Sequence, residues 1–122
     1  MKKILVIDDE EPILRHFEDL LRLLEYDPVT ANNSDDGIEL AQSEDISLII
    51  TDLCMPGTLS EIDHVRQLRA VCPTIPIIVI SGYPTPDIME RCEEIGVTDF
   101  LTKPFELSFV SGILESALPK NS

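Results

Sequence analysis

The chain has 122 residues, 43% of them apolar, which is enough for one compact domain and too few for two. Nine Lys and Arg residues stand against 23 Asp and Glu residues, giving a formal net charge of -14 at pH 7. Phosphate backbones and anionic lipids repel such a chain, so direct binding to nucleic acid or to a membrane surface is not expected.

The amino-terminal residues and the cysteines indicate the compartment. Lys2 and Lys3 are followed by only four apolar residues before Asp8, which is too short for the apolar region of a signal peptide or for a membrane span. The cysteines are odd in number and lack the spacing of metal ligands, which is typical of thiols kept reduced. We therefore expect a cytoplasmic protein.

The hydrophobic pattern alternates between short apolar runs and longer segments in which apolar residues recur at helical spacing. In chain order it predicts a strand at 3–7, a helix opened by Pro12 with its apolar stripe over 13–24, a strand at 28–31, a short helix capped by Asn33, a strand at 46–51, a helix over 62–72, a strand at 76–80, a helix over 88–95 that ends at Gly96, a strand at 100–102 and a helix over 107–118.

This alternation of strands and helices predicts an α/β fold. Right-handed crossovers place a helix over each pair of parallel strands, and the β-branched run at 76–80 is typical of a strand covered on both faces. We predict a flavodoxin-like, doubly wound (βα)5 fold whose five-stranded parallel sheet has the order 2-1-3-4-5. Residues 1–118 would form this domain, and 119–122 a carboxy-terminal tail or the stub of a linker.

Polar residues directly follow four of the predicted strands: Asp8 and Asp9, Asp52, Ser81 and Lys103. In such folds ligands bind at the carboxyl ends of the strands, so these side chains should meet at one edge of the sheet. Each one alone could be a turn former or a helix cap. Together they combine oxygen ligands for a metal with a cation for a phosphate, which favours a functional site.

The predicted strand order brings three carboxylates into a small volume. Crowded carboxylates repel one another, and one of them would take up a proton unless a cation intervened. Mg²⁺ suits this place because it prefers oxygen ligands, keeps several waters and needs only one or two carboxylates besides phosphate oxygens.

Four short motifs occur in the order and strand–helix spacing of a known family: Ile7-Asp8-Asp9-Glu10, Asp52-Leu53-Cys54-Met55-Pro56-Gly57, Ser81-Gly82 and Lys103-Pro104-Phe105. In these motifs, and over nearly its whole length, the sequence resembles the receiver domain of two-component response regulators. That resemblance implies that Asp52 accepts a phosphoryl group from the phosphohistidine of a sensor kinase. It also implies that Mg²⁺ is held by Asp9, Asp52 and the main-chain carbonyl of Cys54, with Asp8 helping through a water.

The same resemblance assigns roles to residues near the end of the chain. Lys103 would contact the phosphoryl oxygens, and Ser81 would swing in to donate a hydrogen bond once the phosphate is present. Phe100 falls where the family keeps a rotating aromatic residue, and the peptide bond before Pro104 would be cis. Phosphorylation would thereby change the surface formed by the fourth helix, the fifth strand and the fifth helix.

The resemblance also implies partners. The chain would be a signalling phosphoacceptor rather than an enzyme, catalysing only its own phosphoryl transfer and dephosphorylation. It would receive the phosphoryl group from a sensor histidine kinase or a phosphotransfer protein and act on a downstream output domain or protein partner. Residues 105–118 contain no Arg or Lys for charged dimer contacts, so we expect a monomer or a weak dimer.

Two alternatives remain at this stage. A phosphatase with an aspartyl-phosphate nucleophile would use similar chemistry, but such enzymes carry two acids separated by one residue after the first strand, and Asp8-Asp9-Glu10 fits that pattern poorly. A receiver-like interaction module without phosphorylation is disfavoured by the complete polar set.

The remaining candidate ligands are assigned structural places. His16 and His64 have no acidic or cysteine partner at metal spacing and are predicted to be exposed helix residues. Cys72 and Cys92 lie on apolar stripes and are predicted to be buried thiols of the core.

Overall fold

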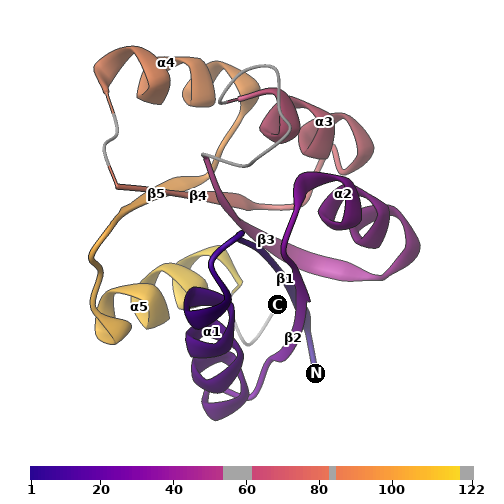
Figure 1. Ribbon diagram of the computed structural model, residues 1–122, viewed down its shortest axis with the longest axis vertical. Helices are drawn as coiled ribbons and strands as arrows, with labels where there is room; N and C mark the ends of the chain where they lie inside the picture. The colour runs from indigo at the N-terminus through magenta and orange to yellow at the C-terminus, as the bar shows by residue number, and fades with distance from the viewer. Residues whose placement is uncertain (54–61, 83–84, 119–122) are drawn as a thin grey trace.

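The computed structural model of the chain describes residues 1–53, 62–82 and 85–118. In this described part, strands and helices alternate along the chain (Figure 1): β1 (Lys3–Ile7), α1 (Glu11–Leu23), β2 (Asp27–Ala31), α2 (Ser34–Ser43), β3 (Ile46–Asp52), α3 (Asp63–Val71), β4 (Ile77–Ser81), α4 (Pro86–Ile95), β5 (Asp99–Thr102) and α5 (Leu107–Ala117).

The strands of the described residues form a single parallel sheet in the order β2-β1-β3-β4-β5, which confirms the predicted fold class and strand order. The register aligns the ends of neighbouring strands. Ile7 pairs with Thr51, Asp52 with Ile80, and Ser81 with Thr102. The residues that end or directly follow β1, β3, β4 and β5 are thereby brought to the same edge of the sheet.

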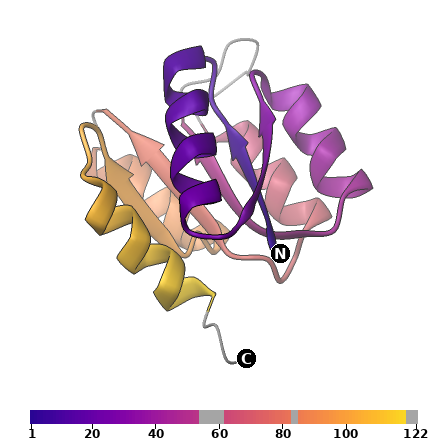
Figure 2. The ribbon, with the colours of Figure 1, turned by 90° about the horizontal axis from the view of Figure 1, so that it is seen from below.

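Helices cover both faces of the sheet, with α1 and α5 on one side and α2, α3 and α4 on the other (Figure 1). Figure 2 shows α1 and α5 lying in front of the strands. Successive strand side chains point to opposite faces, so Ile4 and Val6 of β1 pack with α1 and α5, whereas Leu5 and Ile7 pack with the other layer.

Local sequence signals account for several helix ends. The Asn33 side chain accepts a hydrogen bond from the amide of Asp36 at 2.8 Å and caps α2 as predicted. Thr85 caps α4 by accepting a hydrogen bond from the amide of Ile88 at 3.2 Å. Gly96 ends α4 with a φ of 99°, a backbone conformation that side chains with a Cβ rarely adopt.

The half-buried Arg69 side chain ties α3 to the end of α4. Arg69 donates hydrogen bonds to the carbonyl oxygens of Cys72 at 3.0 Å and Ile75 at 2.7 Å, and to that of Gly96 at 2.7 Å.

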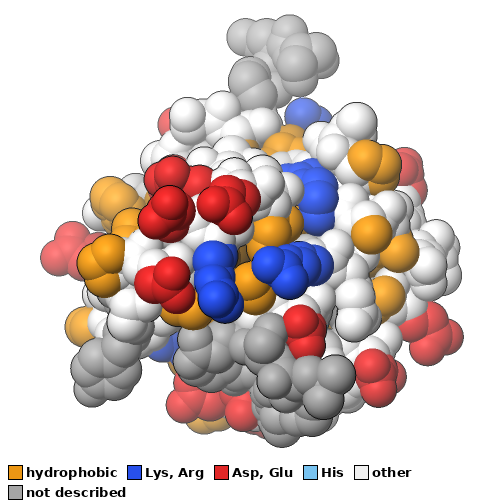
Figure 3. Space-filling view, turned by 90° about the horizontal axis from the view of Figure 1, so that it is seen from above, with side chains coloured by type: hydrophobic (Ala, Val, Ile, Leu, Met, Phe, Trp, Pro, Cys, Tyr) orange, Lys and Arg blue, Asp and Glu red, His pale blue; other side chains and the backbone are white. Residues whose placement is uncertain are grey.

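On the outer surface of α3 and α4, acidic and basic side chains lie next to one another (Figure 3). Among the helices of the described residues, none is both long and apolar enough to cross a membrane.

The cysteine predictions that the structure tests are confirmed, and one histidine prediction is wrong. Cys72 and Cys92 are buried in the core between the sheet and the α2–α4 layer. His16 is exposed, as expected. His64 was predicted to be exposed but is only 1% exposed. It lies one turn before Leu68 on the inward stripe of α3, so helical periodicity turns its ring toward the sheet.

Gly37 in α2 provides a test of this packing. A Cβ at this position would lie 2.8 Å from Cγ1 of Ile7, the fully buried last residue of β1. We expect Gly37→Ala to destabilise the fold by about 1 kcal/mol, because an overpacking cost of roughly 1–3 kcal/mol exceeds the gain in helix propensity. Denaturant unfolding measures this difference.

Gly112 in α5 is the matched control. A Cβ there meets no atom within 4 Å, so Gly112→Ala should stabilise the fold by about 0.5–1 kcal/mol through helix propensity alone. Equal effects of the two substitutions would contradict the close contact between α2 and β1.

Candidate functional site

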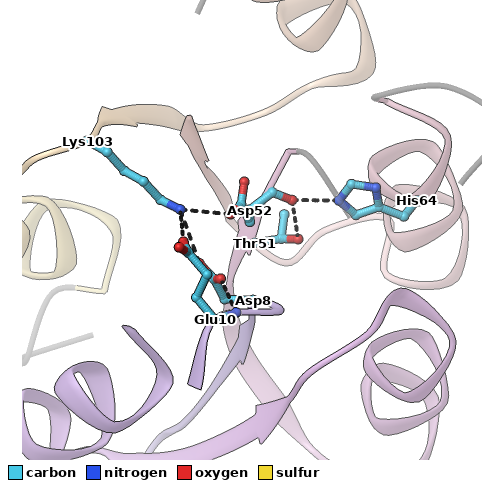
Figure 4. Close-up of polar contacts among 6 residues, drawn as sticks. All are labelled: Asp8, Glu10, Thr51, Asp52, His64 and Lys103. Carbon is cyan, nitrogen blue, oxygen red and sulfur yellow. Dashed lines mark hydrogen bonds and ion pairs between the residues drawn. The ribbon is translucent and has the colours of Figure 1, made fainter. Parts of the chain in front are cut away.

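Side chains from three strand ends meet at the carboxyl edge of the sheet. Asp8 directly follows β1, Asp52 is the last residue of β3, and Lys103 directly follows β5. The Lys103 ammonium lies 2.8 Å from Oδ2 of Asp52 and 3.6 Å from Oδ2 of Asp8 (Figure 4). The same ammonium lies 3.0 Å from Oε2 of Glu10, which immediately precedes α1. The predicted convergence of Asp8, Asp52 and Lys103 is therefore present in the structure.

Asp8 is fully buried, and its two carboxylate oxygens have different surroundings. Oδ1 accepts a hydrogen bond from the amide of Glu10 at 2.9 Å. Oδ2 has no hydrogen-bond partner among the described residues. Burial raises the pKa of Asp8 from 3.8 to about 6, and the neighbouring charge of Asp52 adds to the rise, while the Glu10 amide and Lys103 oppose it. Ionised Asp8 is thus costly in the folded chain.

Lys103 compensates much of this negative charge. Burial alone would lower the pKa of its ammonium, but hydrogen bonds to Asp52 and Glu10, with the charges of Asp52 and Asp8, raise the pKa above its ordinary value. The side chain is 22% exposed, so water reaches the site from one side. Lys103 therefore stays charged at neutral pH.

The acids also form a group with the donor chemistry of a metal site. One carboxylate oxygen from each of Asp8, Glu10 and Asp52 lies within 4.8 Å of the others. Oxygen donors of this kind are the ligands that Mg²⁺ prefers. Asp9 is exposed and does not belong to this group. Glu10 was not predicted from the sequence, although it completes the acidic run that follows β1.

Ser81 and Pro104 lie beside Lys103, and Phe100 lies on β5, the strand that Lys103 follows. Ser81 is 4% exposed, and its carbonyl oxygen accepts a hydrogen bond from the Lys103 amide at 2.9 Å. The peptide bond before Pro104 is cis, as the family resemblance implied. Phe100 on β5 is half-buried and packs against the core beneath the α2–α4 layer. Cys54, whose carbonyl was predicted to bind the metal, lies outside the described residues.

His64 is a second residue that the sequence did not assign to the site. Its Nε2 lies 2.7 Å from the main-chain carbonyl oxygen of Asp52, and the same oxygen accepts a hydrogen bond from the Thr51 hydroxyl at 3.0 Å (Figure 4). Burial lowers the pKa of His64, while its contact with Asp52 opposes this change. The ring therefore contacts the main chain of Asp52 and not the carboxylate cluster.

Comparison with known proteins identifies the family. The family model of the response regulator receiver domain matches residues 4–114. The alkaline phosphatase synthesis transcriptional regulatory protein PhoP of Bacillus subtilis is 31% identical over 120 residues, which cover 98% of this chain and 50% of that protein. The chain spans about half or less of the length of the curated relatives that it matches first.

Solved structures agree with this result. A response regulator receiver domain from Clostridium thermocellum is 29% identical, has a TM-score of 0.88, and is matched over 97% of its length and 99% of this chain. A response regulator from Burkholderia pseudomallei, solved with a phosphorylated aspartic acid, a calcium ion and citrate, is 28% identical with a TM-score of 0.84, covering 99% of this chain and 68% of that one.

These comparisons favour neither the phosphatase nor the module without phosphorylation. Receiver domains are signalling proteins, and the acidic pocket of Asp8, Glu10 and Asp52 fits their magnesium-dependent phosphorylation site. The chain belongs to the receiver domain family of two-component response regulators.

Proposed function

We propose that Asp52 is the phosphoacceptor and takes its phosphoryl group from the phosphohistidine of a sensor histidine kinase or a phosphotransfer protein. The observation that carries this proposal is the 2.8 Å contact between the Asp52 carboxylate and Lys103 in the acidic pocket. The phosphorylated aspartic acid in the Burkholderia pseudomallei relative supports it.

The proposed reaction is an in-line displacement at phosphorus. An oxygen of Asp52 forms the new bond to phosphorus as the bond from phosphorus to the donor imidazole nitrogen breaks, and the electron pair of that bond returns to the imidazole. Such transfers pass through a loose transition state, so the protein mainly positions groups and neutralises charge. Lys103 performs this work from within hydrogen-bond distance of the attacking carboxylate.

Magnesium is part of the same proposal. Asp8, Asp9, Asp52 and the main-chain carbonyl of Cys54 would hold the ion. Oδ2 of buried Asp8 accepts no hydrogen bond from the described residues and faces only the Lys103 ammonium at 3.6 Å, so it is suited to bind a cation. Bound Mg²⁺ supplies positive charge for the phosphoryl oxygens. Glu10 contacts Lys103 at 3.0 Å through a side chain that is 57% exposed, and we assign it to the lysine rather than to the metal.

The response to phosphorylation is proposed to run through Ser81, Phe100 and Pro104. Phosphorylation adds roughly 1.5 to 2 negative charges and oxygens that accept hydrogen bonds. Ser81 lies at the end of β4 next to Lys103. From this position its hydroxyl would turn toward the phosphoryl group. Half-buried Phe100 would then move inward, changing the α4-β5-α5 surface that a downstream output domain or protein partner reads.

The wider setting is proposed from the family. We expect residues 1–118 to act as the receiver domain and 119–122 as a tail or linker stub, in a cytoplasmic protein that is a monomer or a weak dimer. It would act as a signalling phosphoacceptor whose only catalysis is of its own phosphorylation and dephosphorylation.

Incubation with acetyl phosphate and Mg²⁺ tests the phosphoacceptor. Intact-mass analysis and peptide mapping should find one phosphoryl group on Asp52, absent from Asp52→Asn and absent when the metal is chelated. The matched control is Asp45→Asn, which makes the same change at an exposed aspartate before β3 and should leave labelling intact. Undiminished labelling of Asp52→Asn, or turnover of general phosphate esters, would contradict the proposal.

The contribution of Asp9 against that of Glu10 can be separated by two matched amide variants. We expect Asp9→Asn to weaken Mg²⁺ binding by about 10-fold or more, the size of effect typical for groups that hold or orient a metal. Glu10→Gln should have a smaller effect, because Glu10 is outside the proposed ligand set and its largely exposed side chain contacts Lys103. Titration calorimetry with Mg²⁺ measures both dissociation constants. The reverse order would assign the ligand role to Glu10.

Asp8→Asn should stabilise the metal-free chain at pH 7. The folded-state pKa of Asp8 lies above its unfolded value, so the folded chain binds more protons between pH 3.8 and about 6 and loses stability as pH rises through this window. Above it the penalty is on the order of 3 kcal/mol, from a shift of about two pKa units.

Thermal unfolding of both chains against pH measures this gain. The difference between them should shrink as pH falls from about 6 toward 3.8, because Asp8 becomes protonated in the folded wild-type chain and its burial penalty disappears. It should also shrink in saturating Mg²⁺, which the wild-type carboxylate binds better. Asp8→Asn that is no more stable than wild type at pH 7 without metal would show that Lys103 already offsets the whole cost.

A further inference from the structure

The peptide unit that joins Asp52 to Leu53 is held from both sides. Its carbonyl oxygen accepts hydrogen bonds from the Thr51 hydroxyl at 3.0 Å and from His64 Nε2 at 2.7 Å. Its N–H group, the amide of Leu53, donates to the carbonyl oxygen of Ile80 on β4 at 3.1 Å. These contacts fix the main chain at the residue whose carboxylate meets Lys103.

The hydrogen bond defines the state of the His64 ring. A carbonyl oxygen can only accept, so Nε2 carries the proton and Nδ1 is left as an acceptor. Nδ1 is buried and has no hydrogen-bond partner among the described residues. A second proton on Nδ1 would therefore be a buried donor without an acceptor. The ring is thus a neutral donor with a single hydrogen bond, directed at the Asp52 main chain (Figure 4).

An imidazole is energetically unfavourable at this position in the core. His64 lies in the first turn of α3 next to Val65 and one turn before Leu68, both fully buried. Burying a polar ring there costs free energy that an aliphatic side chain would not cost. The stabilising contribution of the ring is one hydrogen bond, donated by Nε2 to the Asp52 carbonyl oxygen.

We propose that His64 is a positioning residue for the phosphoacceptor, holding the Asp52 main chain so that its carboxylate stays directed at Lys103 and at the metal. Lys103 sits 2.8 Å from the carboxylate, while His64 holds the carbonyl of the same residue from α3. The β-carboxylate has two rotatable bonds of its own, and anchoring the backbone on which it turns restricts where it can point. This role rests on the proposed function of Asp52.

The test compares three variants of the full chain. His64→Leu keeps the approximate volume and removes the donor. His64→Gln can return an amide N–H to the position of Nε2. Val65→Ala is the matched packing control, since it removes buried methyl groups from the neighbouring position without touching the Asp52 carbonyl. The measurements are the rate of phosphoryl uptake from acetyl phosphate, the dissociation constant for Mg²⁺ and the carbonyl ¹³C resonance of Asp52, which reports its hydrogen bonds.

We expect His64→Leu to slow phosphoryl uptake and to raise the Mg²⁺ dissociation constant, each by about 10-fold to 100-fold, as for other groups that orient a metal ligand. Its Asp52 carbonyl resonance should shift upfield. His64→Gln should restore all three values toward wild type. Val65→Ala should lower the melting temperature and leave uptake and Mg²⁺ binding near wild type.

The proposal is overturned if folded His64→Leu behaves as wild type, or if folded His64→Gln is as impaired as His64→Leu. If His64→Leu does not fold, His64→Gln decides alone, and unfolding of both variants would assign the ring to packing and overturn the proposal as well. A wild-type chain that takes up no phosphoryl group would overturn the function proposed for Asp52 instead, and the Mg²⁺ affinities and the ¹³C shift would still decide the role of His64.

Discussion

The arrangement of the site depends on one ammonium group placed among carboxylates. Lys103 lies within 3.6 Å of oxygens from Asp8, Glu10 and Asp52, and those oxygens lie within 4.8 Å of one another. At such separations in a partly buried pocket, repulsion between ionised acids is strong, and one nearby cation relieves all of them. Lys103 directly follows β5, so a residue from the last strand neutralises the carboxylates at the ends of β1 and β3.

The sheet places these charges. Parallel strands end at a common edge, and the observed register aligns Asp52 with Ile80 and Ser81 with Thr102. Strands β1, β3 and β4 are largely apolar and buried on both faces, so a one-residue slip would exchange the two cores as well as displace the acids. Packing energy therefore fixes the positions of the polar groups, which do not have to support the fold themselves. Buried Asp8, with its raised pKa, acts against the stability of the folded state.

Hydrophobic periodicity predicted the fold because the strand pattern and the helix pattern alternate regularly along the chain. Alternating apolar runs and helical stripes gave every strand and helix of the described residues, with bounds that differ by a few residues, such as β3 reaching Asp52 and β5 beginning at Asp99. The sequence could predict the positions of four site residues, because the carboxyl ends of parallel strands all lie at one edge of the sheet. These residues are Asp8, Asp52, Ser81 and Lys103. Glu10 was missed because its position depends on the short turn into α1, whose path apolar periodicity does not describe.

The prediction for His64 was wrong for a different reason. The position of His64 one turn before Leu68 indicated burial, but the prediction of an exposed side chain was based on the lack of an acidic or cysteine partner at metal spacing. A buried polar group in a well-packed core requires a partner, so the conflict between stripe and side chain was itself the signal that a partner exists. That partner is a main-chain oxygen, which is present at every residue and leaves no mark in the sequence. Side chains that act on backbone groups therefore become visible only in three dimensions, even when the side chains that act on ligands can be read from the chain.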